Sequence, residues 1–432
     1  MKKNIVKTLV LSVFILTLSD IALIAQEQKT NRPNIILIMA DDLGYEGLSC
    51  NGGQSYSTPK LDQLASTGIR FEHCYSQPLC TPSRVQIMTG RYNFRNYKMF
   101  GYLDPGETTF GNILKDAGYV TCIAGKWQLG NGIEGPNHAG FDEYCLWQIY
   151  TRVAGKYVLG PRYADPKVHV NGKVLENTKG EYGPDIFVDF INDFILENKD
   201  KSFFVYYPMV LTHDPFVPTP DSEEWENDRY KKDKKLFKDM VEYMDKSIGR
   251  IIDNLDELGL RENTLIIFIG DNGSPRQIKS KFNDGWIQGG KAFMTDAGTH
   301  VPLIANWPGT IPSGLVSDDL IDFSDFLPTL TEIGMTDIPE YLVVDGQSFY
   351  PQLKGEIGNP REWVFSHYWG RGRDVFKTRE FVRDKRYKLY NDRKFFDILN
   401  DSLEENPIPE EMITEKLGAI KLRLQNVLDN MK

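Results

Sequence analysis

Two apolar stretches of the chain each end abruptly in a polar pair. Residues 34–40 read N-I-I-L-I-M-A and are followed by Asp41 and Asp42. Residues 264–270 repeat this pattern and are followed by Asp271 and Asn272. Continuous apolar runs of this length are typical of central strands that are covered on both faces. Because ligands gather beyond the carboxyl ends of the strands in open α/β sheets, we expect the two polar pairs to meet there.

Helical patterns lie between these predicted strands. Thr58 and Pro59 suit the cap and first turn of one helix, and Thr108 precedes the apolar positions of another. A longer helix is predicted at about 233–258, with Gly259 at its exit. Its apolar positions form one face and are predicted to be core: Leu236, Phe237, Met240, Val241, Met244, Ile248, Ile251, Ile252, Leu255 and Leu258.

Strand and helix patterns alternate up to about residue 350, which predicts an α/β fold with a large mixed, mainly parallel sheet sandwiched between helices. Beyond that point short β-rich pieces at 363–368, 380–383, 387–390 and 394–396 are joined by charged turns, and a helical pattern covers about 410–431. We therefore predict an α/β domain over 26–350 and a small C-terminal α+β subdomain over 351–432, with an antiparallel sheet and a terminal helix.

The overall charge argues against one class of partner. The chain has 50 Lys and Arg against 60 Asp and Glu, a formal net charge of -10. Nucleic acid is held mainly by broad basic surfaces, so we expect no nucleic-acid partner. An anionic substrate would need a local cationic pocket.

Residues 1–25 resemble a secretory signal peptide. Lys2, Lys3 and Lys7 precede an apolar run at 9–18, and Ala25 stands before a polar segment. A membrane anchor is the alternative, but the run is short for a span and Asp20 follows it. We expect an exported protein, periplasmic or extracellular, with no stable membrane span after cleavage.

The five cysteines are Cys50, Cys74, Cys80, Cys122 and Cys145. In an oxidising compartment an odd number leaves one unpaired, and the sequence around Cys80 nominates that residue. The other four either form one or two disulfides or are small buried hydrophobic residues, and the sequence does not choose between these alternatives.

The segment Cys80-Thr81-Pro82-Ser83-Arg84 carries the most chemical information. Thr81 and Pro82 suit the cap and first residue of a helix over 83–88, so Cys80 is predicted at a helix N-terminus, where free N–H groups favour an anion. Arg84, four residues further on, can lie on the same side of the helix.

This C-x-P-S-R segment, with Thr89-Gly90-Arg91 after it, resembles the signature of the type I sulfatase family, part of the alkaline-phosphatase-like superfamily. In that family the cysteine is oxidised to formylglycine, whose hydrate is the nucleophile, so the resemblance implies a formylglycine-generating or anaerobic maturation enzyme as a partner. Nearly the whole mature chain is similar to family landmarks in the family order: residues 33–44, 58–64, 125–130, 140–142 and 271–273.

A metal site is predicted from the two polar pairs. Asp41, Asp42, Asp271 and Asn272 offer only hard oxygen ligands, which suit Ca²⁺ or Mg²⁺ and argue against zinc. A carboxylate that caps a strand end would be the simpler interpretation of either pair alone. The resemblance implies Ca²⁺, with the modified Cys80 in the same ligand set.

Hydrolysis of a sulfate monoester needs cationic groups, a strong nucleophile and an acid for the departing oxygen. The resemblance places Arg84, Lys126 and Lys291 on the sulfate and makes His213, in T-H-D-P-F, the acid that protonates the leaving alcohol. The chain departs from the family pattern at Gln128, where a histidine usually follows G-K-W. Glutamine cannot take a proton at neutral pH, which leaves the base of the second half-reaction open.

The sequence thus predicts a sulfuric ester hydrolase that acts on sulfated carbohydrates. One rival is a phosphoester or phosphonate ester hydrolase of the same superfamily, and another is a non-catalytic binder of sulfated glycans that keeps the cationic pocket. Trp147, Tyr150, Trp369, Arg371 and Arg373 are candidates for sugar contacts. The sequence does not indicate which sugar is bound or which position of the sugar carries the sulfate.

Overall fold

The computed structural model describes residues 32–431, apart from 151, 154–155, 158–159 and 370–377. The predicted signal peptide at 1–25 lies outside the described residues, as do Arg371 and Arg373. In the described part of the chain, no helix combines the length and the apolar character that a membrane crossing requires.

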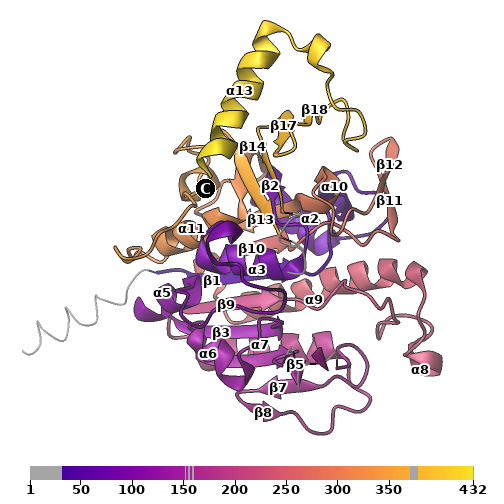
Figure 1. The fold of residues 1–432 in the computed structure, drawn as a ribbon. Helices are drawn as coiled ribbons and strands as arrows, with labels where there is room; N and C mark the ends of the chain where they lie inside the picture. The colour runs from indigo at the N-terminus through magenta and orange to yellow at the C-terminus, as the bar shows by residue number, and fades with distance from the viewer. Residues whose placement is uncertain (1–31, 151, 154–155, 158–159, 370–377, 432) are drawn as a thin grey trace, which may run out of the picture.

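A ten-stranded sheet forms the centre of the molecule (Figure 1). The five central strands run parallel, and antiparallel pairs occur between β10 and β13, β13 and β2, β4 and β7, and β7 and β8. The predicted mixed, mainly parallel sheet is confirmed. In spatial order the strands are β14 (Leu315–Asp322), β2 (Ile69–Tyr75), β13 (His300–Asn306), β10 (Thr264–Gly270), β1 (Asn34–Ala40), β9 (Phe203–Pro208), β3 (Val120–Lys126), β4 (Glu143–Trp147), β7 (Val168–Val170) and β8 (Lys173–Val174).

Helices cover both faces of this sheet, as β1 shows residue by residue. Ile36, Ile38 and Ala40 pack into one core with α2 (Pro59–Ser66), α7 (Gly183–Glu197) and α9 (Phe237–Glu257). The alternate residues Ile35, Leu37 and Met39 pack into a second core with α3 (Cys80–Thr89), α5 (Phe110–Asp116) and α11 (Phe326–Ile333). Side chains of a strand alternate between its faces, so a strand buried on both sides must be apolar throughout.

The helix boundaries partly correct the sequence prediction. Helix α2 begins at Pro59 as predicted, but its free N–H groups at Lys60 and Leu61 donate to the carboxylate of Asp245 on α9, at 3.0 and 2.8 Å. Helix α5 is capped by Thr109, and Thr108 is not the cap. Helix α3 starts at Cys80 with Leu79 as its N-cap, so the predicted cap at Thr81 was wrong.

The long helix α9 matches its predicted apolar face, and Gly259 follows it with a left-handed φ of 66°. Ile252 and Leu258 are only partly buried, while the other predicted core positions of that face are buried.

A four-stranded antiparallel sheet lies beyond residue 351, as predicted. It consists of β15 (Val364–Tyr368), β16 (Arg379–Arg383), β17 (Tyr387–Tyr390) and β18 (Phe395–Asp397), and α13 (Glu415–Asn430) packs on it through Leu424 and Leu428. The same small core includes Tyr92, which follows α3, so the terminal part of the chain is joined to the larger sheet through that segment.

All five cysteines are free thiols in the structure, and only Cys50 is not fully buried. For the four cysteines other than Cys80, this agrees with the alternative without disulfides, and three of the four, Cys74, Cys122 and Cys145, are buried.

Candidate active site

The predicted site residues come together at the carboxyl ends of the central strands. Asp41 and Asp42 follow β1, Asp271 and Asn272 follow β10, and Lys126 is the last residue of β3. His213 lies in the loop after β9, Cys80 begins α3, and Lys291 lies between β12 (Gly285–Gln288) and α10 (Asp296–Thr299). The topology therefore gathers residues from distant parts of the sequence, such as Asp42 and Lys291, which are 249 positions apart.

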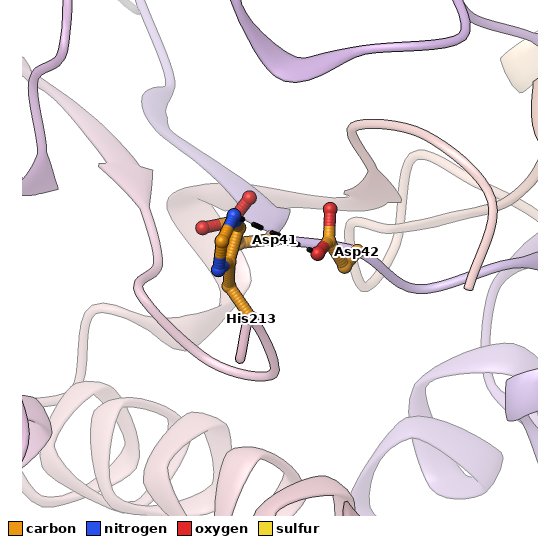
Figure 2. A group of neighbouring side chains, drawn as sticks. All are labelled: Asp41, Asp42 and His213. Atoms are coloured by element: carbon orange, nitrogen blue, oxygen red, sulfur yellow. Dashed lines mark ion pairs between the residues drawn. The ribbon is translucent and has the colours of Figure 1, made fainter. Parts of the chain in front are cut away.

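The acidic residues form a buried cluster. Asp41, Asp42, Asp271 and Asn272 are all inaccessible to solvent. The Asp42 backbone N–H donates to Asp271 Oδ1 at 3.0 Å, and Asn272 Nδ2 donates to Asp42 Oδ1 at 2.9 Å. One potential ligand atom each from Asp41, Cys80 and Asp271 lies within 4.8 Å of the others, as do atoms of Asp41, Asp42 and His213, the group drawn in Figure 2.

Each buried carboxylate has its own cationic partner. Lys126 Nζ lies 2.8 Å from both oxygens of Asp41. Lys291 Nζ lies 2.5 Å from Asp42 Oδ2, and Arg84 reaches Asp271 Oδ2 at 3.3 Å. Arg84 is itself fixed by a 2.9 Å hydrogen bond from its guanidinium to the Lys126 carbonyl oxygen. Burial of three carboxylates is tolerated here because each charge is compensated at contact distance.

The carboxylates differ in proton affinity although they are neighbours. Burial and the negative charge of Asp41 raise the pKa of Asp271 to about 7, against the opposing effect of Arg84. Burial acts on Asp41 in the same direction, but Lys126, His213 and Arg84 outweigh it and hold its pKa well below the ordinary value. In the metal-free protein, Asp271 is therefore the carboxyl group of this pair that can hold a proton near neutral pH.

Two buried polar atoms at the site have no hydrogen-bond partner among the described residues: Asn272 Oδ1 and Arg84 Nε. Such atoms are rare in folded proteins and call for a partner of matching chemistry. The amide oxygen, together with the carboxylates of Asp41, Asp42 and Asp271, is a set of hard oxygen donors that fits a divalent cation such as Ca²⁺. The guanidinium N–H fits an oxygen of an anion.

Cys80 lies inside this site at the first residue of α3 and is only 1% exposed. Its Sγ lies 3.0 Å from Gln128 Oε1. Burial raises the pKa of the Cys80 thiol, so the unmodified side chain is a protonated thiol that donates to the Gln128 carbonyl oxygen. A protonated, buried thiol is a poor nucleophile, so cysteine itself is unsuited to attack an ester here.

His213 and Lys291 stand at the opening of the site, with side chains 18% and 19% exposed. Nδ1 of His213 lies 2.7 Å from the Asp214 carbonyl oxygen and 2.9 Å from the Asp214 carboxylate, which places its proton there and leaves Nε2 toward Asp42 at 3.8 Å (Figure 2). Burial lowers the pKa of His213, opposed by Asp42 and Asp41.

Residues that support the His213 loop were not found from the sequence. Tyr163 donates its hydroxyl hydrogen to the carbonyl oxygens of Val210 at 2.7 Å and His213 at 2.5 Å. Arg162 donates to the Asp214 carbonyl oxygen at 2.5 Å and lies 4.4 Å from the ring centroid of Trp147. No pattern around residues 162–163 signals these contacts with a loop 50 positions away.

The residues predicted to contact a sugar differ in their burial and contacts. Trp147 is buried and donates to the Gly160 carbonyl oxygen, so it is structural. Tyr150 is 43% exposed and lines a cavity of about 230 Å³ together with Phe100, Tyr102 and Asn131. Trp369 packs against Tyr97.

The site combines a buried carboxylate cluster, three cations and a partly exposed histidine at the carboxyl ends of the strands of an α/β sheet. A metal-assisted hydrolase of anionic esters uses groups of these kinds. Two family models match the chain: "Sulfatase" over residues 33–334 and "N-sulphoglucosamine sulphohydrolase, C-terminal" over 284–431. The chain belongs to the sulfatase family of the alkaline-phosphatase-like superfamily and is a sulfuric ester hydrolase.

Individual relatives agree with this assignment. The chain is 33% identical to arylsulfatase A of Homo sapiens, over 83% of this chain and 74% of that protein. It is 32% identical to N-acetylgalactosamine-6-sulfatase of Canis lupus familiaris, over 75% of this chain and 66% of that protein. Among solved structures, Ps i-CgsB in complex with k-i-k-neocarrahexaose matches with a TM-score of 0.77 and 25% identity, over 92% of both chains.

Proposed function

We propose that the protein hydrolyses sulfate monoesters of sulfated carbohydrates with a formylglycine made from Cys80 and with bound Ca²⁺. The observation that carries the proposal is the position of Cys80, at a helix N-terminus and beside the carboxylates of Asp41 and Asp271, the second of which pairs with Arg84. A hydrated aldehyde at residue 80 supplies a nucleophilic hydroxyl that the buried thiol cannot supply.

The metal would be held by Asp41, Asp42, Asp271 and Asn272, with residue 80 as a further ligand. Hard oxygen donors and the unpartnered Asn272 Oδ1 support Ca²⁺, and Mg²⁺ is the less suitable alternative because it demands a smaller octahedral site. A bound divalent cation would supply Lewis-acid polarisation of an oxygen at residue 80.

The three cations of the site would contact the sulfate group at different depths. Arg84 would use its unpartnered Nε on a sulfate oxygen. Lys291, which is partly exposed at the opening, would contact the sulfate group of an incoming substrate, and the fully buried Lys126 would stabilise charge deeper in the site. In its doubly protonated form, His213 would give its Nε2 proton to the departing alcohol, while its Nδ1 proton stays on Asp214.

The substrate class and the compartment are also proposals. One relative is an N-acetylgalactosamine-6-sulfatase, and one similar structure holds a neocarrahexaose, so we propose a sulfated carbohydrate. The signal-like residues 1–25 support export to the periplasm or the exterior, after or during conversion of Cys80 by a maturation enzyme.

The first prediction concerns residue 80. Cys80→Ala or Cys80→Ser, produced in a host that performs the maturation, is expected to lower kcat by more than about 1000-fold, because neither side chain forms a geminal diol. Peptide mass spectrometry should find an aldehyde in place of the thiol in the unsubstituted protein. Near-normal turnover by homogeneous Cys80→Ala protein would contradict the mechanism, and absence of any turnover by aldehyde-bearing protein would favour the non-catalytic binder. Comparing the turnover of sulfate esters with that of phosphate esters distinguishes the proposed function from the remaining alternative, a phosphoester or phosphonate ester hydrolase.

The second prediction concerns the metal and pH. Because Asp271 has a pKa of about 7 in the metal-free protein, Ca²⁺ must displace a proton from it. The apparent Ca²⁺ affinity is therefore expected to fall about tenfold per pH unit below 7 and to level off above 8. Calorimetric titrations at pH 6, 7 and 8 measure this, with Asp221→Asn as a control at an exposed acidic residue. An affinity that does not change with pH would refute the role of Asp271.

The third prediction concerns the acid. His213→Ala is expected to lower kcat/KM for a sugar sulfate by about 100-fold or more, because a poor leaving alcohol needs a proton. The loss for 4-nitrophenyl sulfate should be much smaller, since nitrophenolate leaves without one. The exposed His138 provides a matched control, as His138→Ala should affect neither substrate. Equal losses of activity on both substrates with His213→Ala would exclude this role.

The fourth prediction concerns Gln128, which lies 3.0 Å from Cys80 Sγ but cannot accept a proton. Return of the aldehyde requires deprotonation of a hydroxyl at residue 80, so release of sulfate should limit turnover. Rapid mixing with 4-nitrophenyl sulfate is expected to give a burst of nitrophenol and a slow steady phase. Gln128→His should speed that slow phase. A linear time course whose rate follows the leaving group would show that the first step is limiting.

A further inference from the structure

The loop that carries Lys291 contains a backbone conformation that its own sequence does not favour. Ala292, the next residue, has a φ of 73°, in the left-handed region that alanine rarely adopts. Such a conformation costs free energy and persists only where surrounding contacts hold it. The loop therefore depends on partners outside itself to keep Lys291 in place.

One set of partners lies in the part of the chain that forms the ten-stranded sheet and its helices. The Lys291 N–H donates to the Ser274 carbonyl oxygen at 3.1 Å, and the Ala292 N–H donates to the Pro78 carbonyl oxygen at 2.9 Å. These contacts hold the N-terminal side of the turn, and Pro78 also leads into the Cys80 helix. The C-terminal side of the turn needs a separate anchor.

That anchor is supplied by the C-terminal part of the chain. Lys388 Nζ, on β17, donates to the Met294 carbonyl oxygen at 2.5 Å. The Tyr390 hydroxyl contacts the same oxygen at 3.1 Å and shares its hydrogen with the carboxylate of Glu404. The carboxylate of Glu404 accepts from Lys388 Nζ at 2.8 Å and from the Asp296 N–H at 2.9 Å. We call Lys388, Tyr390 and Glu404 the clamp.

The charges of the clamp are buried without being needed for chemistry. The side chains of Lys388 and Glu404 are 0% and 2% exposed, and the ammonium group lies 4.0 Å from the ring centroid of Phe381. A buried ion pair is seldom the most stable way to fill such a space, but it fixes geometry, because a displaced partner would leave an uncompensated charge. Neighbouring Arg383 holds Asp296 in the same manner, at 2.5 Å.

We propose that Lys388 and Glu404 are positioning residues that hold the Ala292 turn and thereby place Lys291 for contact with sulfate. The inference rests on the proposed role of Lys291 as a sulfate-binding cation. It assigns to the C-terminal subdomain a part in the reaction, exerted through a carbonyl oxygen three residues from Lys291.

Lys388→Met is the primary test, with inorganic sulfate as the probe. Sulfate should inhibit the variant 10- to 100-fold less well than the unsubstituted enzyme, because small displacements of a binding group cost factors of this order. KM for 4-nitrophenyl sulfate should also be higher in the Lys388→Met variant. Lys385→Met is the control, because Lys385 lies in the same subdomain as Lys388 and forms an exposed ion pair with Asp318 of β14. This substitution should change neither the inhibition by sulfate nor KM. A folded Lys388→Met protein with normal sulfate inhibition would overturn the proposal.

A second variant separates positioning from a general structural role. Ala292→Gly, combined with Lys388→Met, should recover a substantial part of the sulfate inhibition, because glycine adopts a left-handed φ without penalty. Lost packing in the subdomain would not be restored by a change beside Lys291, so absence of recovery in a folded double variant would overturn the proposal.

Tyr390→Phe is decisive if Lys388→Met does not fold, since it removes the hydroxyl that contacts both Met294 and Glu404 and leaves the ion pair of Lys388 with Glu404 in place. It should weaken sulfate inhibition severalfold, and unchanged inhibition would overturn the proposal. Failure of the proposed function is distinguishable, because then the unsubstituted protein itself would neither cleave the ester nor be inhibited by sulfate.

Discussion

The site depends on the neutralisation of three carboxylates in a space that excludes water. Asp41, Asp42 and Asp271 are each matched by one cation, and these cations are the groups proposed to bind sulfate. An unmatched charge in such a place would cost several kcal/mol. In the proposed mechanism the same side chains would also serve the chemistry, because a bound divalent cation would take over the carboxylates and leave the cations for an anion.

The sheet provides the rigidity that this exchange of partners requires. Strands β1 and β10 pair in register over seven residues, from Asn34 with Thr264 to Ala40 with Gly270, so both polar pairs emerge at the same level. The two faces of β1 belong to different cores, and both cores must be disturbed before the strand can move.

Prediction from the sequence succeeded where a signal was local. The bounds of β1 and β10 follow from uninterrupted apolar runs that end in polar pairs. The residues nominated by short motifs lie together in the structure, and their catalytic and metal-binding roles stay predictions. It failed where a distant contact decides the outcome. Asp245 satisfies N–H groups of α2 from 184 and 185 positions away. The cap of α5 is a local miss, because Thr109 and Asn112 form a capping box that the sequence prediction did not recognise. Nothing in the sequence near Lys388 points to Met294, since a buried lysine and an exposed one look alike in a β-rich segment.

The burial of Cys80 also has a consequence in time. Gln77, three positions before it, accepts a hydrogen bond from Ser366, which is 289 residues further along the chain. Translation is directional, so residue 80 is synthesised well before the segments that finally enclose it. If an enzyme oxidises Cys80 as proposed, its access to the thiol would be widest during that interval and would close as the terminal sheet folds. Under the proposed mechanism, the fraction of active molecules would then be set by a competition between two rates, enzymatic conversion and completion of the fold, and slower growth of the chain would favour the first.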